Sequence, residues 1–259
     1  LLLFVLTPRI FGDAFHNTKD IIFLSLYSVS LFYYFRIVDY ESKYNIILFG
    51  LFSALATTIR ILGFFFPLSL IFIWFLGVIS KKTEVKISTI IIYIISYFFF
   101  LFIFWPLLWE NTLHNFLSYF KILEDYFGSK VFFLGNYYFP DNLPYYYLSF
   151  WILISTPVIH LILFFTGFGF YLRRLIKRFL VIKNFSIYKD LWRSNNEKKD
   201  FLIFLNLIIF FLFFSYMNIK LYNSWRVAYF LYIFIIYFAS FSIYLLFKII
   251  KKNKYETIF

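Results

Sequence analysis

Residues 87–105 read ISTIIIYIISYFFFLFIFW, an apolar run that contains no charged side chain. At a rise of 1.5 Å per residue, about 20 helical residues cross the roughly 30 Å hydrocarbon core of a bilayer. A helix is expected because backbone N–H and C=O groups inside lipid must be hydrogen-bonded within the chain. The stretch therefore predicts a transmembrane helix.

Similar runs, bounded by charged or turn residues, recur along the chain of 259 residues. We expect seven spans, at about 20–37, 45–59, 62–79, 87–105, 148–172, 201–217 and 227–247. The run 45–59 is short and crosses only with the help of tilt or of neighbouring helices. The predicted fold class is an all-α, polytopic transmembrane helical bundle, and residues 1–259 form a single transmembrane domain. The apolar residues 1–6 are too few to span, so we expect them to end a helix that begins before Leu1, in an N-terminally truncated chain.

Composition supports the same class. Hydrophobic residues make up 63% of the chain and charged residues only 15%. A water-soluble domain of this size leaves too much of its surface in water to hide that many apolar side chains, and disorder requires low hydrophobicity. The chain has no Cys, which excludes disulfides, thiolate nucleophiles and thiolate metal sites.

Lys and Arg are unevenly divided between the two sides of the predicted membrane. One side, which includes the basic loop 173–200, carries 18 Lys and Arg residues against 7 Asp and Glu, whereas the other carries 7 against 6. The positive-inside rule makes the basic side cytoplasmic. We therefore expect a multi-pass protein of a bacterial inner or plasma membrane, whose net charge of +12 reflects membrane topology and membrane lipids and requires no nucleic-acid partner.

The longest outward segment is the loop 106–147. Within it, residues 111–127 place Leu113, Phe116, Leu117, Phe120, Leu123 and Phe127 on one helical stripe, with polar residues on the other faces. This pattern predicts an amphipathic helix that lies in the outer membrane interface.

Ionisable residues at membrane depth are costly and usually functional, and here they gather at outward helix ends. The segment 7–20 brings together Arg9, Asp13, His16, Lys19 and Asp20. Asp20 begins a predicted helix, where a carboxylate can cap free N–H groups. The alternative is that Asp20 and His16 contact a polar acceptor or a divalent metal, the one cofactor that these side chains could hold.

Two arginines form the second group of candidates. Arg60 lies between two apolar runs, without a carboxylate nearby in the sequence, and Arg226 follows Trp225 at the start of the last run. Each arginine either snorkels to the lipid headgroups or binds a phosphate at an outward-facing cavity. For Arg226 a bound anion is the better explanation, because the helix dipole disfavours a cation at a helix N-terminus. Trp225 is expected to anchor the helix in the aromatic belt.

His160 lies inside a predicted span, and we expect it to be a packed, hydrogen-bonded side chain. The sequence contains no nucleotide-binding glycine loop or Walker motif. Any sugar or lipid donor must therefore arrive already activated.

Five stretches together resemble the dolichyl-phosphate-mannose protein mannosyltransferase-like family, which is related to the lipid A aminoarabinose transferases. They are TPRIFGDAFHNTKD (7–20), GLFSALATTIRILG (50–63), WPLLWENTLHNF (105–116), LGNYYFPDNLPYYYLSFWILISTP (134–157) and LYNSWRVAYFLY (221–232). The chain departs from the family pattern where Asp13 replaces a His and Thr18 a Pro, and where Val227 or Ala228 stands in place of a late His.

The resemblance implies a GT-C membrane glycosyltransferase. Such an enzyme moves a sugar from a polyprenyl-phosphate donor to a protein, lipid or glycan acceptor at the outer, extracytoplasmic face of the membrane. It implies that Arg60 and Arg226 bind the donor phosphate, that Asp20 and His16 are acceptor or metal candidates, and that Arg9, Lys19 and Trp225 are further loop candidates. The catalytic acid of the family lies in an earlier outward loop, which would precede Leu1. The rival readings are a non-enzymatic flippase or transporter of lipid-linked sugars, and a structural membrane subunit.

Topology can be tested with single cysteines because the native chain has none. A Cys introduced at Asn136, in the outward loop, should react with a membrane-impermeant maleimide in intact cells. A Cys introduced at Ser194, in the basic loop, should react only after the membrane is opened. Labelling of position 136 from the cytoplasmic side alone would contradict the assignment of sides.

Overall fold

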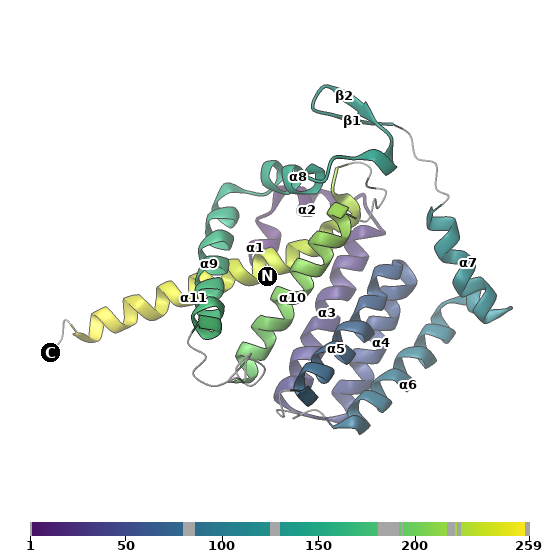
Figure 1. Cartoon of the computed structure of the whole chain (residues 1–259), viewed down its shortest axis with the longest axis horizontal. Coiled ribbons are helices and arrows are strands. Elements are labelled where there is room, and N and C mark those ends of the chain that lie inside the picture. Colours follow the sequence, from purple (N-terminus) through teal and green to yellow (C-terminus); the bar gives the residue numbers. More distant parts are fainter. Residues whose placement is uncertain are drawn as a thin grey trace.

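The computed structural model describes residues 2–79, 86–124, 130–180, 192, 194–216, 221 and 224–256. Within them the chain is an all-α bundle with one small antiparallel hairpin (Figure 1). The helices are α1 (Leu2–Val5), α2 (Pro8–Asp13), α3 (Asp20–Asp39), α4 (Lys43–Ile59), α5 (Phe65–Ile79), α6 (Ile87–Phe104), α7 (Thr112–Glu124), α8 (Tyr147–Ser155), α9 (Val158–Leu180), α10 (Asn195–Tyr216) and α11 (Tyr232–Glu256). Short 3₁₀ segments include η1 (Ile61–Phe64), η2 (Pro106–Leu108), η3 (Pro140–Asn142) and η5 (Arg226–Leu231), and the hairpin pairs β1 (Val131–Phe133) with β2 (Asn136–Tyr138).

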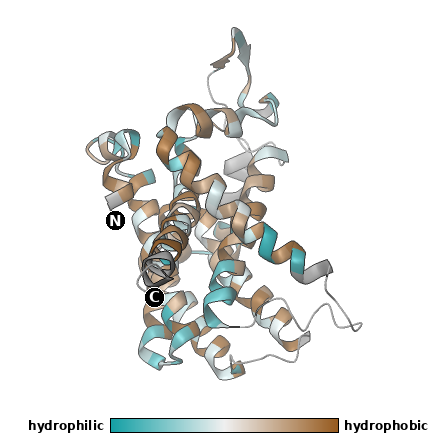
Figure 2. Cartoon of the chain, turned by 90° about the vertical axis from the view of Figure 1, so that its left-hand side faces the viewer, coloured by the Kyte–Doolittle hydropathy of each residue, from teal (hydrophilic) through white to brown (hydrophobic). Residues whose placement is uncertain are grey.

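Six of the described helical stretches are long and apolar enough to cross a membrane, and α4 is a shorter apolar helix of 17 residues. The six are Asp20–Asp39, Ile61–Val78, Ile87–Phe104, Val158–Lys177, Asn195–Tyr216 and Arg226–Ile250. Hydrophobic residues dominate these ribbons in Figure 2. The architecture is that of a multi-pass membrane protein, and the expectation of an all-α membrane bundle is confirmed.

Helix α6 shows why this bundle requires lipid around it. Its outer stripe, Ile91, Ile95 and Phe98, is between 51% and 64% exposed. On the opposite face Tyr93 and Tyr97 are fully buried, and their hydroxyls hydrogen-bond to hydroxyls of α4. Apolar side chains face out and polar ones face in, an arrangement that is stable in hydrocarbon and costly in water.

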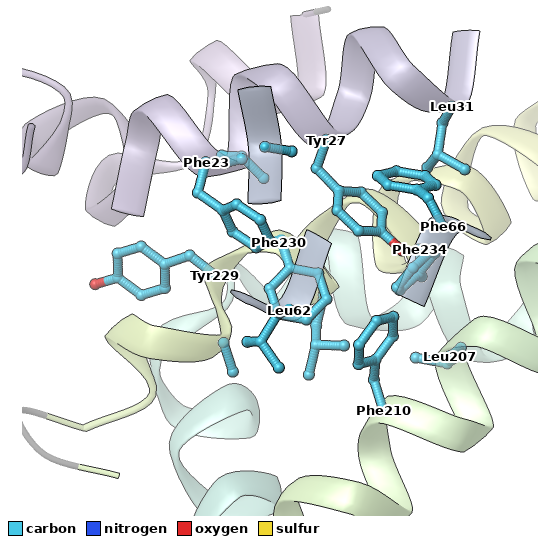
Figure 3. Close-up of a cluster of buried hydrophobic side chains, with 14 of the residues drawn as sticks. Phe23, Tyr27, Leu31, Leu62, Phe66, Leu207, Phe210, Tyr229, Phe230 and Phe234 are labelled. Atoms are coloured by element: carbon cyan, nitrogen blue, oxygen red, sulfur yellow. The ribbon is translucent and has the colours of Figure 1, made fainter. Parts of the chain in front are cut away.

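The centre of the bundle is an aromatic cluster (Figure 3). Tyr27 of α3 packs against Phe66, Phe210, Phe230 and Phe234, with ring centroids 4.2 to 6.2 Å apart. These rings come from α3, α5, α10, η5 and α11, so the cluster joins helices that are distant in sequence. Because lipid tails are as apolar as the side chains, close packing rather than escape from water holds such helices together.

The predicted span 148–172 is wrong as a single helix. The structure divides it at Thr156 and Pro157 into α8 and α9, with Thr156 in an extended conformation (φ −92°, ψ 135°). Proline disfavours a helical conformation at the preceding residue and has no N–H to donate. Helix α8 therefore lies at the end of the bundle near α2 and the hairpin, and α9 alone is long enough to span (Figure 1).

The predicted outward helix at 111–127 corresponds to α7. Phe116 packs on Phe64 and Trp105, whereas Leu113 and Leu117 are 79% and 63% exposed. The side chains of residues 119–124 and all of 125–129 lie outside the described residues, including the remaining members of the predicted stripe. The position of this helix in the membrane interface stays a prediction.

Polar contacts gather the helix ends that we assigned to the cytoplasm. Lys199 Nζ lies 2.5 Å from Asp39 Oδ2, and Arg174 Nη2 lies 2.7 Å from Asp200 Oδ2. Asn195 of α10 also donates a hydrogen bond to the carbonyl at the end of α3, at 3.0 Å. These contacts bring α3, α9 and α10 together at one end. The charge pattern thus grouped the ends of these helices correctly, while the identity of the cytoplasmic face stays a prediction.

Gly167 allows α9 and α11 to cross closely. A Cβ atom at this position would overlap the backbone carbonyl of Phe238, and beside it Thr166 and Ser242 share a hydrogen bond of 2.7 Å. Gly167→Ala should destabilise the protein by about 1–3 kcal/mol, the usual cost of overpacking. Gly169→Ala, on the same helix but with open space at its Cβ, is the matched control. Equal melting temperatures of the two variants in detergent would contradict this account of the crossing.

Candidate functional site

Three helix ends meet at the carboxylate of Asp20. Asp20 begins α3 and is 2% exposed, Arg60 follows α4, and Arg226 begins η5. Arg60 Nη2 pairs with Asp20 Oδ1, and Arg226 Nε lies 2.9 Å from Asp20 Oδ2. Asn17 completes this group, which we call the Asp20 cluster, through a hydrogen bond of 2.8 Å from its Nδ2 to Oδ2.

Each member has a local reason for its position. The Asn17 side chain also accepts the backbone N–H of Asp20, at 3.0 Å, so one amide fixes both the start of α3 and its carboxylate. Arg60 lies at the C-terminal end of α4, where the helix dipole favours a cation. Arg226 lies at the N-terminal end of η5, where the helix dipole disfavours a cation. The carboxylate of Asp20 compensates for this unfavourable interaction.

This geometry adds a partner that the sequence analysis did not consider. We expected each arginine to reach lipid headgroups or a phosphate, but both contact Asp20, which precedes Arg60 by 40 residues. The anion that the position of Arg226 requires is a side chain of the protein itself. The residues next to each arginine in the sequence do not indicate this pairing, because tertiary packing brings the three residues together.

The exposed part of the Asp20 cluster is positively charged. Two guanidinium groups contact one carboxylate, and the carboxylate is the enclosed member of the group. The Arg226 side chain is 35% exposed and that of Arg60 is 13% exposed, while Asp20 is almost completely enclosed. An anion approaching this end of the bundle would therefore meet the arginines, and Arg226 first.

A second group of polar residues, the Arg9 cluster, lies beside the first. Arg9 Nε donates to the Tyr229 hydroxyl at 2.5 Å, and this hydroxyl donates in turn to Asp13 Oδ2. Arg9 also donates to Ser224 Oγ. Its guanidinium lies 5.9 Å from the ring centroid of Trp151 and 5.6 Å from that of Tyr229, in cation–π range.

The two clusters are physically linked. Arg226 and Tyr229 are three residues apart in η5, and side chains with this spacing eclipse one another in a 3₁₀ helix. In segment 7–20, the backbone N–H of Asn17 donates to the carbonyl of Asp13 at 2.7 Å, so the two clusters are also joined on this side. Segment 7–20 thus runs along segment 224–232 in antiparallel order, and a 2.7 Å hydrogen bond between Thr7 and Tyr232 closes the far end.

The other predicted residues differ in burial and in contacts. His160 is buried and hydrogen-bonds through Nδ1 to the Tyr232 hydroxyl at 2.5 Å, which confirms the packed role. Trp225 is not a belt residue, because it is 1% exposed and donates to Ser155 Oγ at 2.7 Å. His16 and Lys19 are exposed, and in the described part of the chain their side chains form no hydrogen bond or ion pair with the Asp20 cluster.

No metal site emerges from the residues that the structure describes. They contain no group of three or more His, Cys, Asp or Glu side chains that could hold a metal ion. The Asp20 oxygens already accept contacts from Arg60, Arg226 and Asn17, and two adjacent cations disfavour a third. In this arrangement Asp20 is suited to fixing arginines rather than to ligating a metal.

Sequence reasoning missed Asn17 and Tyr229 as members of the site. Each had a signal: Asn17 precedes the helix start at Asp20 by three residues, and Tyr229 follows Arg226 by the same interval. Comparisons of the chain with protein-family models, curated proteins and solved structures gave no match, so the site is interpreted from its own geometry.

Asp20→Asn tests whether the carboxylate holds the site together. Removing its charge leaves two arginines facing each other, and breaking a buried ion pair costs about 3–5 kcal/mol. We expect a loss near the lower end, about 3 kcal/mol, because Arg226 is partly exposed. Glu110→Gln, which changes an exposed acid in the loop 106–147, is the control and should leave the unfolding transition unchanged. If both variants unfold in detergent at the wild-type temperature, Asp20 is not the structural counterion.

Proposed function

We propose that the chain forms the donor-binding part of an integral-membrane glycosyltransferase of the GT-C type. The enzyme transfers a sugar from a polyprenyl-phosphate donor to a protein, lipid or glycan acceptor at the outer face of the membrane. The observation that carries the proposal is the Asp20 cluster, in which two arginines contact one enclosed carboxylate and the Arg226 side chain is 35% exposed at the end of an apolar bundle. The family resemblance of the five sequence stretches supplies the reaction.

The chemistry of the donor matches this position. A polyprenyl tail dissolves in the hydrocarbon, so its phosphate lies at the membrane boundary, where the helix ends carrying Arg60 and Arg226 also lie. Guanidinium groups bind phosphate oxygens through paired, charge-assisted hydrogen bonds. When the sugar leaves, the phosphate gains negative charge, and a cation already in place lowers the energy of that transition state.

In this proposal Asp20 is neither the acceptor contact nor the metal ligand that the sequence analysis considered. Its carboxylate orients the two guanidinium groups and prevents their mutual repulsion, while Arg226 supplies the accessible charge. A group that deprotonates the acceptor hydroxyl is also required. The resemblance assigns that role to an acid in another outward loop.

Arg226 is the residue whose loss is most informative, because Arg226→Ala leaves the contact between Asp20 and Arg60 in place and should preserve folding. A charge-assisted contact to phosphate is worth about 1.5–3 kcal/mol, so kcat/KM should fall about 10- to 150-fold in the full-length enzyme. Arg226→Lys should recover part of the loss, since Lys keeps the charge but not the paired geometry. Arg173→Ala, which removes an exposed arginine at the opposite end of the bundle, is the control.

Two measurements separate the proposal from its rivals. Binding of decaprenyl phosphate to the purified protein should weaken in Arg226→Ala, and turnover of decaprenyl-phosphate mannose should weaken with it. Tight binding combined with translocation but no sugar transfer would indicate a carrier. Wild-type donor affinity and turnover in Arg226→Ala would mean that the phosphate assignment is wrong.

A further inference from the structure

We propose that the Arg9 cluster is a subsite for the sugar ring of the donor, in which Asp13 accepts a hydrogen bond from a hexose hydroxyl. The inference rests on the proposed function, because it places the sugar next to a phosphate held by Arg226. Asp13 stands where the related family has a His, so the assignment comes from the contacts of this chain.

The hydrogen-bond directions leave one oxygen of Asp13 available. Tyr229 has a single hydroxyl proton, and it is committed to Asp13 Oδ2, since the same hydroxyl oxygen accepts the Nε–H of Arg9. In the part of the chain that the structure describes, Asp13 Oδ1 has no hydrogen-bond partner. Asp13 is only partly buried, and a carboxylate can accept about four hydrogen bonds. A ligand hydroxyl can therefore reach an acceptor that the protein has already oriented.

The two clusters are neighbours on one face of η5. Arg226 and Tyr229 eclipse one another one 3₁₀ turn apart, a rise of about 6 Å at about 2 Å per residue. In Figure 3 the Tyr229 hydroxyl points away from the aromatic core formed by Phe23, Phe230 and their neighbours. A phosphate at Arg226 would thus place its attached ring toward Tyr229 and Asp13.

Charge selects the type of ligand. Arg9 and Asp13 share the Tyr229 hydroxyl, so the Arg9 cluster combines one positive and one negative side chain. A balanced site with an open carboxylate oxygen favours a neutral hydroxyl donor over a second phosphate or a free cation. Hydrogen bonds to a charged acceptor are among the strong ones, so such a contact discriminates the sugar-bearing donor from the bare lipid phosphate.

The test compares two ligands on the full-length protein. Binding is measured for decaprenyl phosphate and for decaprenyl phosphate carrying mannose, glucose or galactose. In wild type at least one hexosyl form should bind about 10-fold or more tightly than decaprenyl phosphate. Asp13→Ala should abolish this preference and leave decaprenyl phosphate affinity unchanged. Asp13→Asn, which keeps a carbonyl acceptor, should retain part of it.

Controls separate this inference from the proposed function. Tyr229→Phe removes the hydroxyl that orients Asp13 without removing the carboxylate, so it should lower the preference even if Asp13→Ala fails to fold. Glu110→Gln should behave like wild type. A wild-type protein that prefers no hexosyl form, or an Asp13→Ala variant that keeps the preference or loses affinity for both ligands equally, overturns the sugar subsite. Arg226→Ala should weaken both ligands, and failure of that result alone contradicts the phosphate site.

Discussion

The buried carboxylate of Asp20 is the interaction on which one end of the bundle depends. It neutralises one of two arginines that would otherwise repel each other, and it does so from the first residue of α3. Arg60 follows α4 and Arg226 begins η5. This single acid therefore fixes the relative position of three helix ends. The same contact holds the three ends together and leaves Arg226 partly exposed beside an enclosed carboxylate.

The lipid surroundings make this arrangement effective. Within the bundle, polar side chains such as Tyr93 and Tyr97 find partners on a neighbouring helix, and apolar faces turn outward. In the part of the chain that the structure describes, the ion pair of Lys199 with Asp39 joins helices at one end, and the Asp20 cluster joins them at the other. A low dielectric beside the clusters strengthens their electrostatic effect on any ligand at that boundary.

The sequence predicted the class of fold and the helix positions well, because long apolar runs have few alternatives in a membrane. The break at Pro157 was readable in principle, yet the apolar residues on both sides concealed it. For the site, the sequence identified Asp20, Arg60 and Arg226 as residues at outward helix ends but not as partners of one another. Pairing depends on how helices pack, and the decisive contacts of Tyr229 with Arg9 and Asp13 join segments that no local pattern connects.

The antiparallel alignment of segments 7–20 and 224–232 has a consequence for biogenesis. Its contacts join residues 215 to 225 positions apart, so they form only when the last helix has left the ribosome and entered the bilayer. Until then, Asp20 can pair with Arg60 alone, as a neutral couple that is harmless in a partly inserted chain. Arg226 joins Asp20 only on docking of the final segment, so the complete Asp20 cluster is a property of the finished assembly.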